Sequence, residues 1–360
     1  MAYTAIDDPS VYFHTQLYTG NGSSNAITNG GNSDLQPDWL WIKTRSHSSS
    51  HRLMDSFRLA SGEATLSLRS EDTAAESDIA GDGMTSLDSD GFTLNGSGSG
   101  GAVNESGKTY VAWQWKANAG TETTNQSESG SQIACSVQAN TTAKFSIITY
   151  TGTGGNGHTF LHGLGSTPKV IIIKIRTGAN RGWIVYHHKA HANPQENLLL
   201  LNTNAAVADL NRLDDTAPNS TEIAVSDDTH VNADGNTYVS YAFDEVQGYS
   251  KFGSYTGNGS ATDGAFVYTG FSPAWVLMKR TSGSEAWMLV DSKRPGFNVI
   301  DDVLEPNDSA AEGASTDIDL LSNGFKLRKD NSNASGETYI FMAFASSPFV
   351  SSEGVPTTAR

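Results

Sequence analysis

The hydrophobic pattern of this chain predicts short β-strands and few helices. In residues 110–115, Val111, Trp113 and Trp115 share one face of an extended segment, and the residues between them share the other. This period of two is expected of a half-buried strand. Residues 170–175 are apolar on both faces apart from one lysine, which predicts a central strand covered on both sides. We therefore expect an all-β protein.

The same pattern occurs three times along the chain. Each copy begins with a Tyr-Thr-Gly turn, continues with a proline and an apolar strand that ends in lysine, and closes with a Gly-x-Thr-Tyr strand. The first tyrosine and the lysine are 25 residues apart in the first copy and 24 in the others, which indicates an internal repeat. The residues at matching positions are Tyr18, Lys43, Asp55, Arg58 and Tyr110 in the first copy, Tyr150, Lys174 and Tyr238 in the second, and Tyr255, Lys279, Asp291, Arg294 and Tyr339 in the third.

The second copy departs from the other two in its polar positions. The first and third copies contain an Asp-Ser-x-Arg motif, whereas the second reads His-His-Lys-Ala at residues 187–190. The second copy also lacks a clear counterpart of the Gly-Phe-x-Leu segments at residues 91–94 and 324–327. A polar site shared by all three copies is therefore not expected.

Each copy has about 100 residues of short strands separated by turns, which predicts three tandem antiparallel β-sandwich or jelly-roll domains. In the Tyr-Thr-Gly turns, glycine or asparagine is expected at positive φ. Residues 119–143 are rich in Ser, Thr and Asn and nearly free of large apolar side chains, so they predict a linker or long loop. The expected boundaries are 1–118, 144–247 and 248–350 for the domains and 351–360 for a C-terminal tail.

Composition excludes several classes of protein. Lys and Arg number 23 against 39 Asp and Glu, for a net charge of −16, which argues against a nucleic-acid binder. The single cysteine, Cys135, excludes a disulfide framework. No apolar stretch approaches the length of a bilayer span, and the N-terminus has no basic and apolar export signal. We expect a protein made in a cytoplasm, without membrane insertion.

The tryptophans have two interpretations. Trp39 and Trp41, like Trp113 and Trp115, are two residues apart on a predicted strand, so each pair could form a flat platform for a sugar ring. Such pairs more often fill the core of a sandwich, and this alternative is favoured. Trp183 and Trp287 hold matching places and are expected in the core.

The recurring Lys, Asp and Arg residues could form one polar site per copy. A structural ion pair, or a buried lysine whose ammonium is hydrogen-bonded, is the favoured alternative. The histidines of residues 187–191 could bind a metal, but consecutive strand residues point to opposite faces. Acidic turns at residues 80–83 and 88–91 could hold calcium, although a full calcium-binding loop is absent. No cofactor is expected, and no catalytic motif is present.

Together, the Tyr-Thr-Gly, Pro-x-(apolar)-Lys, Asp-Ser-x-Arg and Gly-x-Thr-Tyr motifs resemble a repeat module of virion structural proteins of tailed bacteriophages, particularly marine and cyanobacterial phages. The resemblance covers essentially the whole chain, once per copy. It implies a concanavalin A-like, lectin-type β-sandwich on the particle surface, in a tail appendage or decorating the capsid. No catalytic residues carry over from it.

The leading hypothesis is a non-enzymatic virion protein, a tail fibre or appendage adhesin that presents its repeats to host-surface glycans. The alternative is a capsid-decorating or tail-assembly protein that binds other virion proteins only. A glycan hydrolase is the least favoured. Repeated weak contacts gain from avidity, and a homo-oligomer, naturally a trimer for a fibre, would extend that gain.

Overall fold

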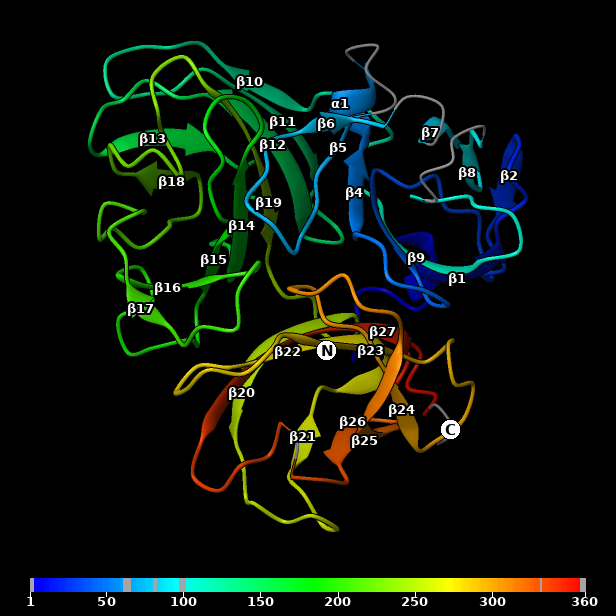
Figure 1. The fold of residues 1–360 in the computed structure, drawn as a ribbon. Coiled ribbons are helices and arrows are strands. Elements are labelled where there is room, and N and C mark those ends of the chain that lie inside the picture. The colour runs from blue at the N-terminus through cyan, green and yellow to red at the C-terminus, as the bar shows by residue number, and fades with distance from the viewer. Residues whose placement is uncertain (1–2, 61–65, 80–82, 97–101, 331, 357–360) are drawn as a thin grey trace.

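The computed structural model describes residues 3–60, 66–79, 83–96, 102–330 and 332–356 (Figure 1). Their regular secondary structure is almost entirely β-strand, joined by turns and loops; the exceptions among the described residues are a 3₁₀ turn at Pro9–Val11 and a short helix, α1, at Ser56–Ala60. All the sheets are antiparallel. The prediction of an all-β fold is confirmed. We use unit 1, unit 2 and unit 3 for residues 1–118, 144–247 and 248–350.

Each unit has its own main sheet with four core strands, and the order of these strands is the same in all three units. We call these the inner sheets. Unit 1 provides β1 (Phe13–Thr19), β9 (Thr109–Trp115), β3 (Trp39–Thr44) and β4 (Arg52–Asp55). Unit 2 provides β12 (Phe145–Thr151), β19 (Thr237–Phe243), β14 (Val170–Ile175) and β15 (Ile184–His187). Unit 3 provides β20 (Ser250–Thr256), β27 (Thr338–Pro348), β22 (Phe271–Arg280) and β23 (Met288–Asp291).

A second sheet lies on the outer side of each inner sheet, away from the centre of the molecule (Figure 1). In unit 1 it contains β2 (Asn25–Thr28), β8 (Gly91–Leu94) and β7 (Met84–Asp88). In unit 2 it contains β13 (His158–Leu161) and β18 (Glu222–Val225). In unit 3 it contains β21 (Phe266–Tyr268), β26 (Gly324–Leu327), β25 (Gly313–Leu321) and β24 (Ile300–Val303). Each pair of sheets encloses its own apolar cluster, so each unit is sandwich-like.

Four further short strands extend this plan. β5 (Leu66–Ser67) and β6 (Ser77–Asp78) form a separate two-stranded ribbon in unit 1. β16 (Asn197–Leu200) and β17 (Ala208–Asp209) continue the inner sheet of unit 2 beyond β15.

The prediction of a linker at residues 119–143 needs correction. This segment contains β10 (Thr124–Gln126) and β11 (Cys135–Asn140), and β11 pairs with β12 along its whole length. Ile133, Cys135 and Val137 point into the apolar cluster of unit 2 and are buried. Because these alternating apolar side chains stand among Ser, Gln and Asn, the composition of the segment hid a strand.

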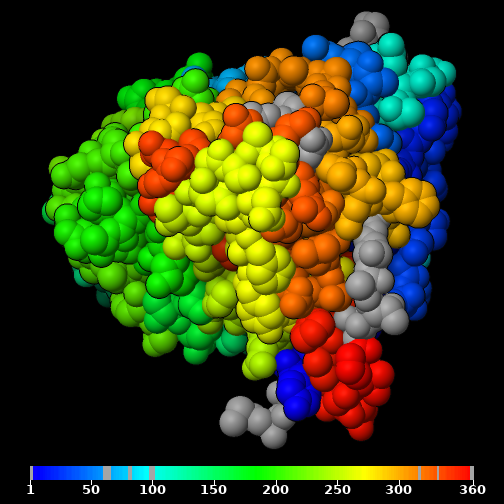
Figure 2. All heavy atoms as spheres, turned by 90° about the horizontal axis from the view of Figure 1, so that it is seen from below, coloured from blue at the N-terminus to red at the C-terminus, as the bar shows by residue number. Residues whose placement is uncertain are grey.

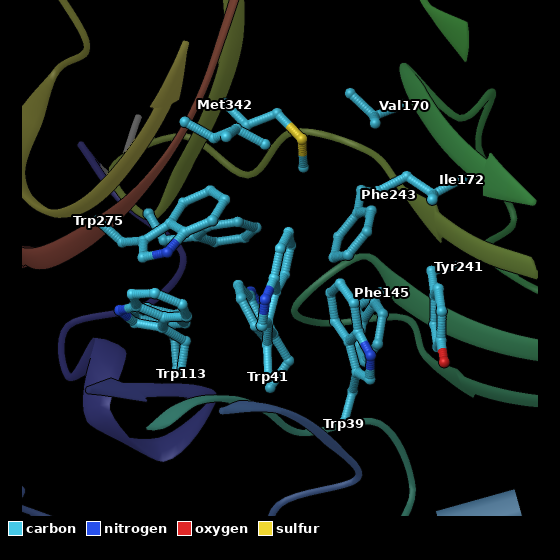
Figure 3. Packing of buried hydrophobic residues seen from close by; sticks show 14 of the residues in the cluster. Trp39, Trp41, Trp113, Phe145, Val170, Ile172, Tyr241, Phe243, Trp275 and Met342 are labelled. Carbon is cyan, nitrogen blue, oxygen red and sulfur yellow. The ribbon is translucent and has the colours of Figure 1, made fainter. Parts of the chain in front are cut away.

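The three inner sheets meet in one shared aromatic core (Figure 3). Trp39 of unit 1 stacks on Tyr241 of unit 2, with ring centroids 4.3 Å apart. Phe344 of unit 3 contacts Phe13 of unit 1 at 5.3 Å and Phe243 of unit 2 at 5.9 Å. This is the largest apolar cluster of the described residues, and all three units contribute to it. The units therefore form one body around a common centre.

The tyrosines of the repeat have the same geometry in every unit. The first tyrosine stacks on the Gly-x-Thr-Tyr tyrosine, with centroids 5.0, 4.9 and 5.1 Å apart in units 1, 2 and 3. The hydroxyl of Tyr18 donates to the carbonyl of Val103 at 2.7 Å, and Tyr150 and Tyr255 make the corresponding bonds. This bond fixes the start of the turn against the loop that precedes the last inner strand.

The glycines of the turn are required for two different reasons. A Cβ on Gly20, Gly152 or Gly257 would lie 2.2–2.3 Å from a backbone oxygen of the neighbouring loop, a separation that real atoms do not reach. The last glycine of each turn, Gly22, Gly154 or Gly259, has a φ of 69°, where only glycine is unstrained. The expectation of positive φ in this turn is confirmed.

Candidate functional site

The four tryptophans proposed as a sugar platform lie inside the molecule. Trp39, Trp41, Trp113 and Trp115 are 0–2% exposed and belong to the shared aromatic core. A sugar ring cannot reach them, so the platform interpretation is wrong and the favoured alternative, a position in the core, is confirmed. The tryptophan face of β9 looks outward only when unit 1 is considered alone, because units 2 and 3 cover it. Trp183 and Trp287 are also buried.

The recurring lysines are buried, and two of them cross between units. The ammonium of Lys174 donates to the carbonyls of Thr73, in unit 1, and Arg181 at 2.9 and 2.6 Å. Lys279 likewise donates to Asn204, in unit 2, at 3.3 Å. Burial lowers the pKa of Lys43, Lys174 and Lys279 to about 8 in each case. Lys174 and Lys279 therefore join units, and none of the three lysines is exposed to a ligand.

The Asp-Ser-x-Arg motif of unit 1 joins unit 1 to unit 2. Asp55 and Arg58 form a buried ion pair at 2.6 Å, and Tyr241 of unit 2 donates its hydroxyl to Asp55 at 2.8 Å. Arg58 also binds Glu76 at 2.7 Å, and Glu76 binds Arg176 of unit 2 at 2.9 Å. Burial disfavours the charge of Arg58, but the carboxylates around it outweigh this and raise its pKa. We call this network the 1–2 junction.

Unit 3 joins unit 1 through the same set of contacts. Asp291 and Arg294 pair at 2.6 Å, and the indole of Trp113 donates to Asp291 at 3.0 Å, in the place that Tyr241 holds above. Arg294 binds Glu312 at 2.9 Å, and Glu312 binds Arg45 of unit 1 at 2.7 Å. The contacts of the aspartate, arginine and glutamate match those of the 1–2 junction atom for atom, and the indole of Trp113 replaces the hydroxyl of Tyr241. We call this network the 3–1 junction.

The 2–3 junction closes the ring with uncharged residues at the positions of the Asp-Arg and Glu-Arg pairs of the other two junctions. His187 takes the place of the aspartate and approaches the carbonyl of Phe341, in unit 3, at 3.2 Å. Its Nδ1 accepts the N–H of Lys189 at 3.1 Å, so Nε2 carries the proton and the ring is neutral. Burial, with help from His188, lowers the pKa of His187 to about 3.

The positions that hold the arginine and the Glu-Arg pair in the other junctions are neutral as well. Ala190 replaces the arginine of the motif. The backbone N–H of Val207 donates to the carbonyl of Thr281 at 3.1 Å. In the 1–2 junction the backbone N–H of Glu76 donates to the carbonyl of Arg176 in the same way, so Val207 and Thr281 occupy the places of that glutamate and arginine. His188 contacts the carbonyl of Phe252 in unit 3 at 2.7 Å. The whole charged set has been replaced together.

The possible metal sites find no support in these contacts. His187 and His188 are occupied by carbonyls of unit 3. Asp88 accepts from Ser86 and Thr93, both at 2.7 Å. Of the acidic turn at residues 80–83, residues 80–82 lie outside the described residues. The described residues contain no group of three His, Cys, Asp or Glu side chains that could hold a metal ion.

The candidate functional surface is instead the outer edge of unit 3. Phe266 and Tyr268 are two residues apart on β21, the edge strand of the outer sheet, and are 47% and 59% exposed. By their pairing with the neighbouring strand, Ala26 and Thr28 hold these places in unit 1, and Thr159 and Leu161 hold them in unit 2. Only unit 3 therefore presents aromatic side chains there.

A hollow of 380 Å³ adjoins this edge. Its walls include Tyr3, Lys169, Lys251, Tyr268 and Phe349. The amino group of Lys169 lies 2.8 Å from Glu245 and 3.5 Å from Asp244, and Glu245 also contacts Lys251 at 3.4 Å, so two lysines face two carboxylates. The described ends of the chain lie together beside unit 3, where Ser352 donates its N–H to Asp7 at 2.7 Å (Figure 2).

Sequence reasoning missed two features. Asn104, Asn232 and Asn333 are fully buried and bind the backbone of the Tyr-Thr-Gly turn in all three units. Each stands three residues before the glycine of Gly-x-Thr-Tyr, so alignment of the copies could have found them. The exposed pair on β21 gave no signal, because an aromatic residue in a predicted strand is equally typical of a core.

The comparisons with known proteins give a family and no function. No curated protein matches the chain. Among the described residues no helix is long and apolar enough to span a membrane, since the α-helix there has five residues. A family model described as a domain of unknown function, DUF7483, matches residues 8–348 and thus spans all three units. The chain belongs to the DUF7483 family.

Proposed function

We propose that this chain is a non-enzymatic structural protein of a tailed bacteriophage particle, which docks to another virion protein through unit 3. The observation that carries the proposal is the difference between the copies: the three units close into one ring, yet only unit 3 exposes an aromatic pair at its edge. The phage assignment itself rests on the sequence resemblance. In this proposal each unit is a concanavalin A-like jelly roll.

The ring suits a structural part. The three junctions and the shared core bury the surfaces by which separate units would move, so the chain can act as a rigid spacer. Because the units already surround a common centre, one chain has the arrangement expected of a trimer of single units. Self-association of the whole chain stays a proposal, which sedimentation of the purified protein tests.

Gold labelling of this protein on intact particles, viewed by electron microscopy, is the first test. Label over the capsid supports a decorating protein, and label on a tail appendage supports an appendage component. Absence from the particle would overturn the proposal. A truncated protein without residues 248–350 is a poor control, since unit 3 contributes to the shared core; the double variant Phe266→Ala, Tyr268→Ala keeps the ring and should lose incorporation.

A host-glycan adhesin is the second candidate, and Phe266 and Tyr268 are the observation that favours it. Two exposed rings on one face of a strand can stack on sugar rings, as the buried tryptophans cannot. Glycan-array binding that is lost in the double alanine variant would support it. Phe297→Ala is the matched control, because Phe297 is 81% exposed near the opposite edge of the same sheet.

A further inference from the structure

The outer edge of unit 3 carries backbone groups that point away from the molecule. In β21, the N–H of Thr269 donates to Asn323 and the carbonyl of Ala265 accepts from Leu327. Since bonding alternates along an antiparallel pair, the N–H and C=O groups of Phe266 and Tyr268 point away from β26. Within the described part of the chain, the structure shows no hydrogen bond to these outward groups.

The neighbouring edge of the inner sheet is open over the second half of β20, beyond Phe252, whose N–H donates to Glu245 of unit 2. In β20, the carbonyl of Tyr249 accepts from Ala345, and Gly257 donates to Glu337. The backbone groups of Ser254 and Thr256 therefore point away from β27, and both residues are exposed. No described residue bonds to these groups either. The strands β20 and β21 are thus two unpaired edge strands on the same side of the sandwich, one in each sheet.

In unit 2 this same edge is occupied by another part of the chain. The N–H of Thr159 donates to Ser131, and the N–H of Ile133 donates to Thr159, both at 2.8 Å. Thr159 holds the place of Phe266. On the inner sheet, β11 pairs with β12 and places Ser136 opposite Thr149, the counterpart of Ser254. Residues 123–140 therefore cover both edge strands of unit 2, β12 and β13.

In unit 1 the edge is blunted by its own side chains. The amide of Gln16 donates to the carbonyl of Leu17 at 2.9 Å, and the amide of Asn25 donates to the carbonyl of Thr19 at 3.2 Å. Leu17 and Thr19 match Ser254 and Thr256 of unit 3, which have no such cap. Natural proteins usually cover or blunt exposed strand edges, because an open edge pairs with other strands.

We propose that the open edge of β20 and β21 binds an extended peptide segment of a partner protein, which adds to unit 3 as residues 123–140 add to unit 2. The occupant has apolar side chains at alternate positions, as at Ile133, Cys135 and Val137, to reach the rim of the sandwich and the exposed rings of Phe266 and Tyr268. Main-chain hydrogen bonds supply affinity and alternate side chains supply specificity in this mode of recognition. The 380 Å³ hollow beside Tyr268 receives a side chain at one end. In Figure 2 the yellow segment that contains β21 lies at the molecular surface.

This inference rests on the proposed docking function and names the chemistry of the partner. The test uses the full chain with two probes: a synthetic peptide of residues 121–142 and a library of random peptides long enough to span the edge. We expect saturable binding of peptides with alternating apolar residues. Hydrogen exchange should slow in residues 254–256 and 266–268, and not in residues 13–19 or 145–151.

Substitutions locate the bound segment. Ser254→Pro removes an outward N–H without touching the bonds to β27, since proline is accepted at such edge positions. It should weaken peptide binding at least about tenfold. Leu17→Pro, at the matching place of unit 1, is the control and should leave binding unchanged. If Ser254→Pro lowers the melting temperature, the double variant Phe266→Ala, Tyr268→Ala gives the same readout with the backbone intact.

Three results would overturn the inference. The first is that neither probe yields binding that depends on Ser254. The second is a dimer in sedimentation that Ser254→Pro dissociates, which would make a second copy the occupant. The third is glycan binding that needs Phe266 and Tyr268 but is indifferent to Ser254→Pro. Failure of gold labelling would remove the virion assignment and leave the peptide result standing, so the two outcomes are distinguishable.

Discussion

The 1–2 junction and the 2–3 junction occupy equivalent places in the ring but use different chemistry. In the 1–2 junction, Asp55, Arg58 and Glu76 form a buried charged network with Arg176 and Tyr241. In the 2–3 junction a neutral histidine and uncharged neighbours fill the same space. Removing one member of a buried ion pair leaves an unpaired charge, whereas replacing the whole set leaves none. Each junction therefore works as one set of residues. This is why unit 2 lacks both the aspartate and the arginine of the motif.

The largest expected effect is in the charged junction. Arg58→Met leaves the carboxylates of Asp55 and Glu76 buried without their main cation, so we expect the free energy of unfolding to fall by about 3–5 kcal/mol. Urea unfolding measures it. Arg328→Met is the control, because the pair of Arg328 with Asp319 is partly exposed and should contribute under about 1 kcal/mol.

A sharper variant replaces the four charged residues of the 1–2 junction by their 2–3 counterparts and keeps Tyr241: Asp55→His, Arg58→Ala, Glu76→Val and Arg176→Thr. If junctions act as sets, this quadruple variant should lose less stability than Arg58→Met alone. A quadruple variant that is less stable than the single one would contradict the idea of interchangeable sets.

The lysines should behave alike in both junctions. Lys174 and Lys279 have pKa values of about 8 in the folded protein, against about 10.4 for an unfolded lysine. Between these values the unfolded chain binds more protons, so stability rises with pH from about 8 to about 10, by up to about 3 kcal/mol per lysine. Lys174→Met and Lys279→Met should each remove a similar part of this rise.

The measurement for the lysines is urea unfolding at pH 8 and pH 10. Higher pH is avoided, because burial raises the pKa of Tyr150 well above its ordinary value while an unfolded tyrosine ionises near pH 10. An unchanged pH dependence in both variants would show that the lysines are solvated. A changed pH dependence in only one variant would show that Lys174 and Lys279 differ in their burial or hydrogen bonding.

The neutral junction should respond more weakly to a single change. His187→Gln keeps a donor for the carbonyl of Phe341, and we expect a loss of about 1 kcal/mol at pH 7. Since the pKa of His187 is lowered to about 3, the unfolded chain binds more protons between about pH 6.5 and pH 3, and stability is lost as pH falls. The variant should lose less stability than the wild type across that range. Equal slopes in thermal unfolding at pH 7 and pH 5 would argue against a buried neutral ring.

The smallest effect on stability is expected at the edge of unit 3. Phe266→Ala with Tyr268→Ala removes side chains that are about half exposed, so the free energy of unfolding should change by no more than about 0.5 kcal/mol per residue. Thermal unfolding measures the change, with Phe297→Ala as the reference for an exposed aromatic residue. A large loss would mean that the pair supports the sandwich and is not available for docking.

Much of the fold could be predicted from the sequence, because its signals are local. The strand at residues 170–175 is covered on both faces, as its pattern predicted. The strand at residues 110–115 was expected to be half-buried, yet both of its faces are buried. One face packs inside unit 1 and the tryptophan face packs against units 2 and 3. An alternating pattern cannot show that other units cover the second face.

The candidate site was harder to predict than the fold. The tryptophan pairs were the residues considered for an aromatic surface, although a core position was favoured for them, and the exposed pair is Phe266 and Tyr268. Nothing local distinguishes β21 from β13, since the difference lies in whether residues 131–133 pair with it. Ligand access depends on which edge remains uncovered, and that depends on the packing of segments far apart in sequence.

The sequence by itself determined the repeat, the β-strands and the turns, since side-chain alternation and glycine conformation act over a few residues. Only the tertiary structure decided what the repeated polar residues do. Trp113 meets Asp291 across 178 positions of the chain, and Tyr241 meets Asp55 across 186. Such pairs form because each of the three inner sheets has an apolar face, and packing these faces against one another removes their apolar surface from water. The ring follows from that burial, and it leaves one edge of unit 3 open.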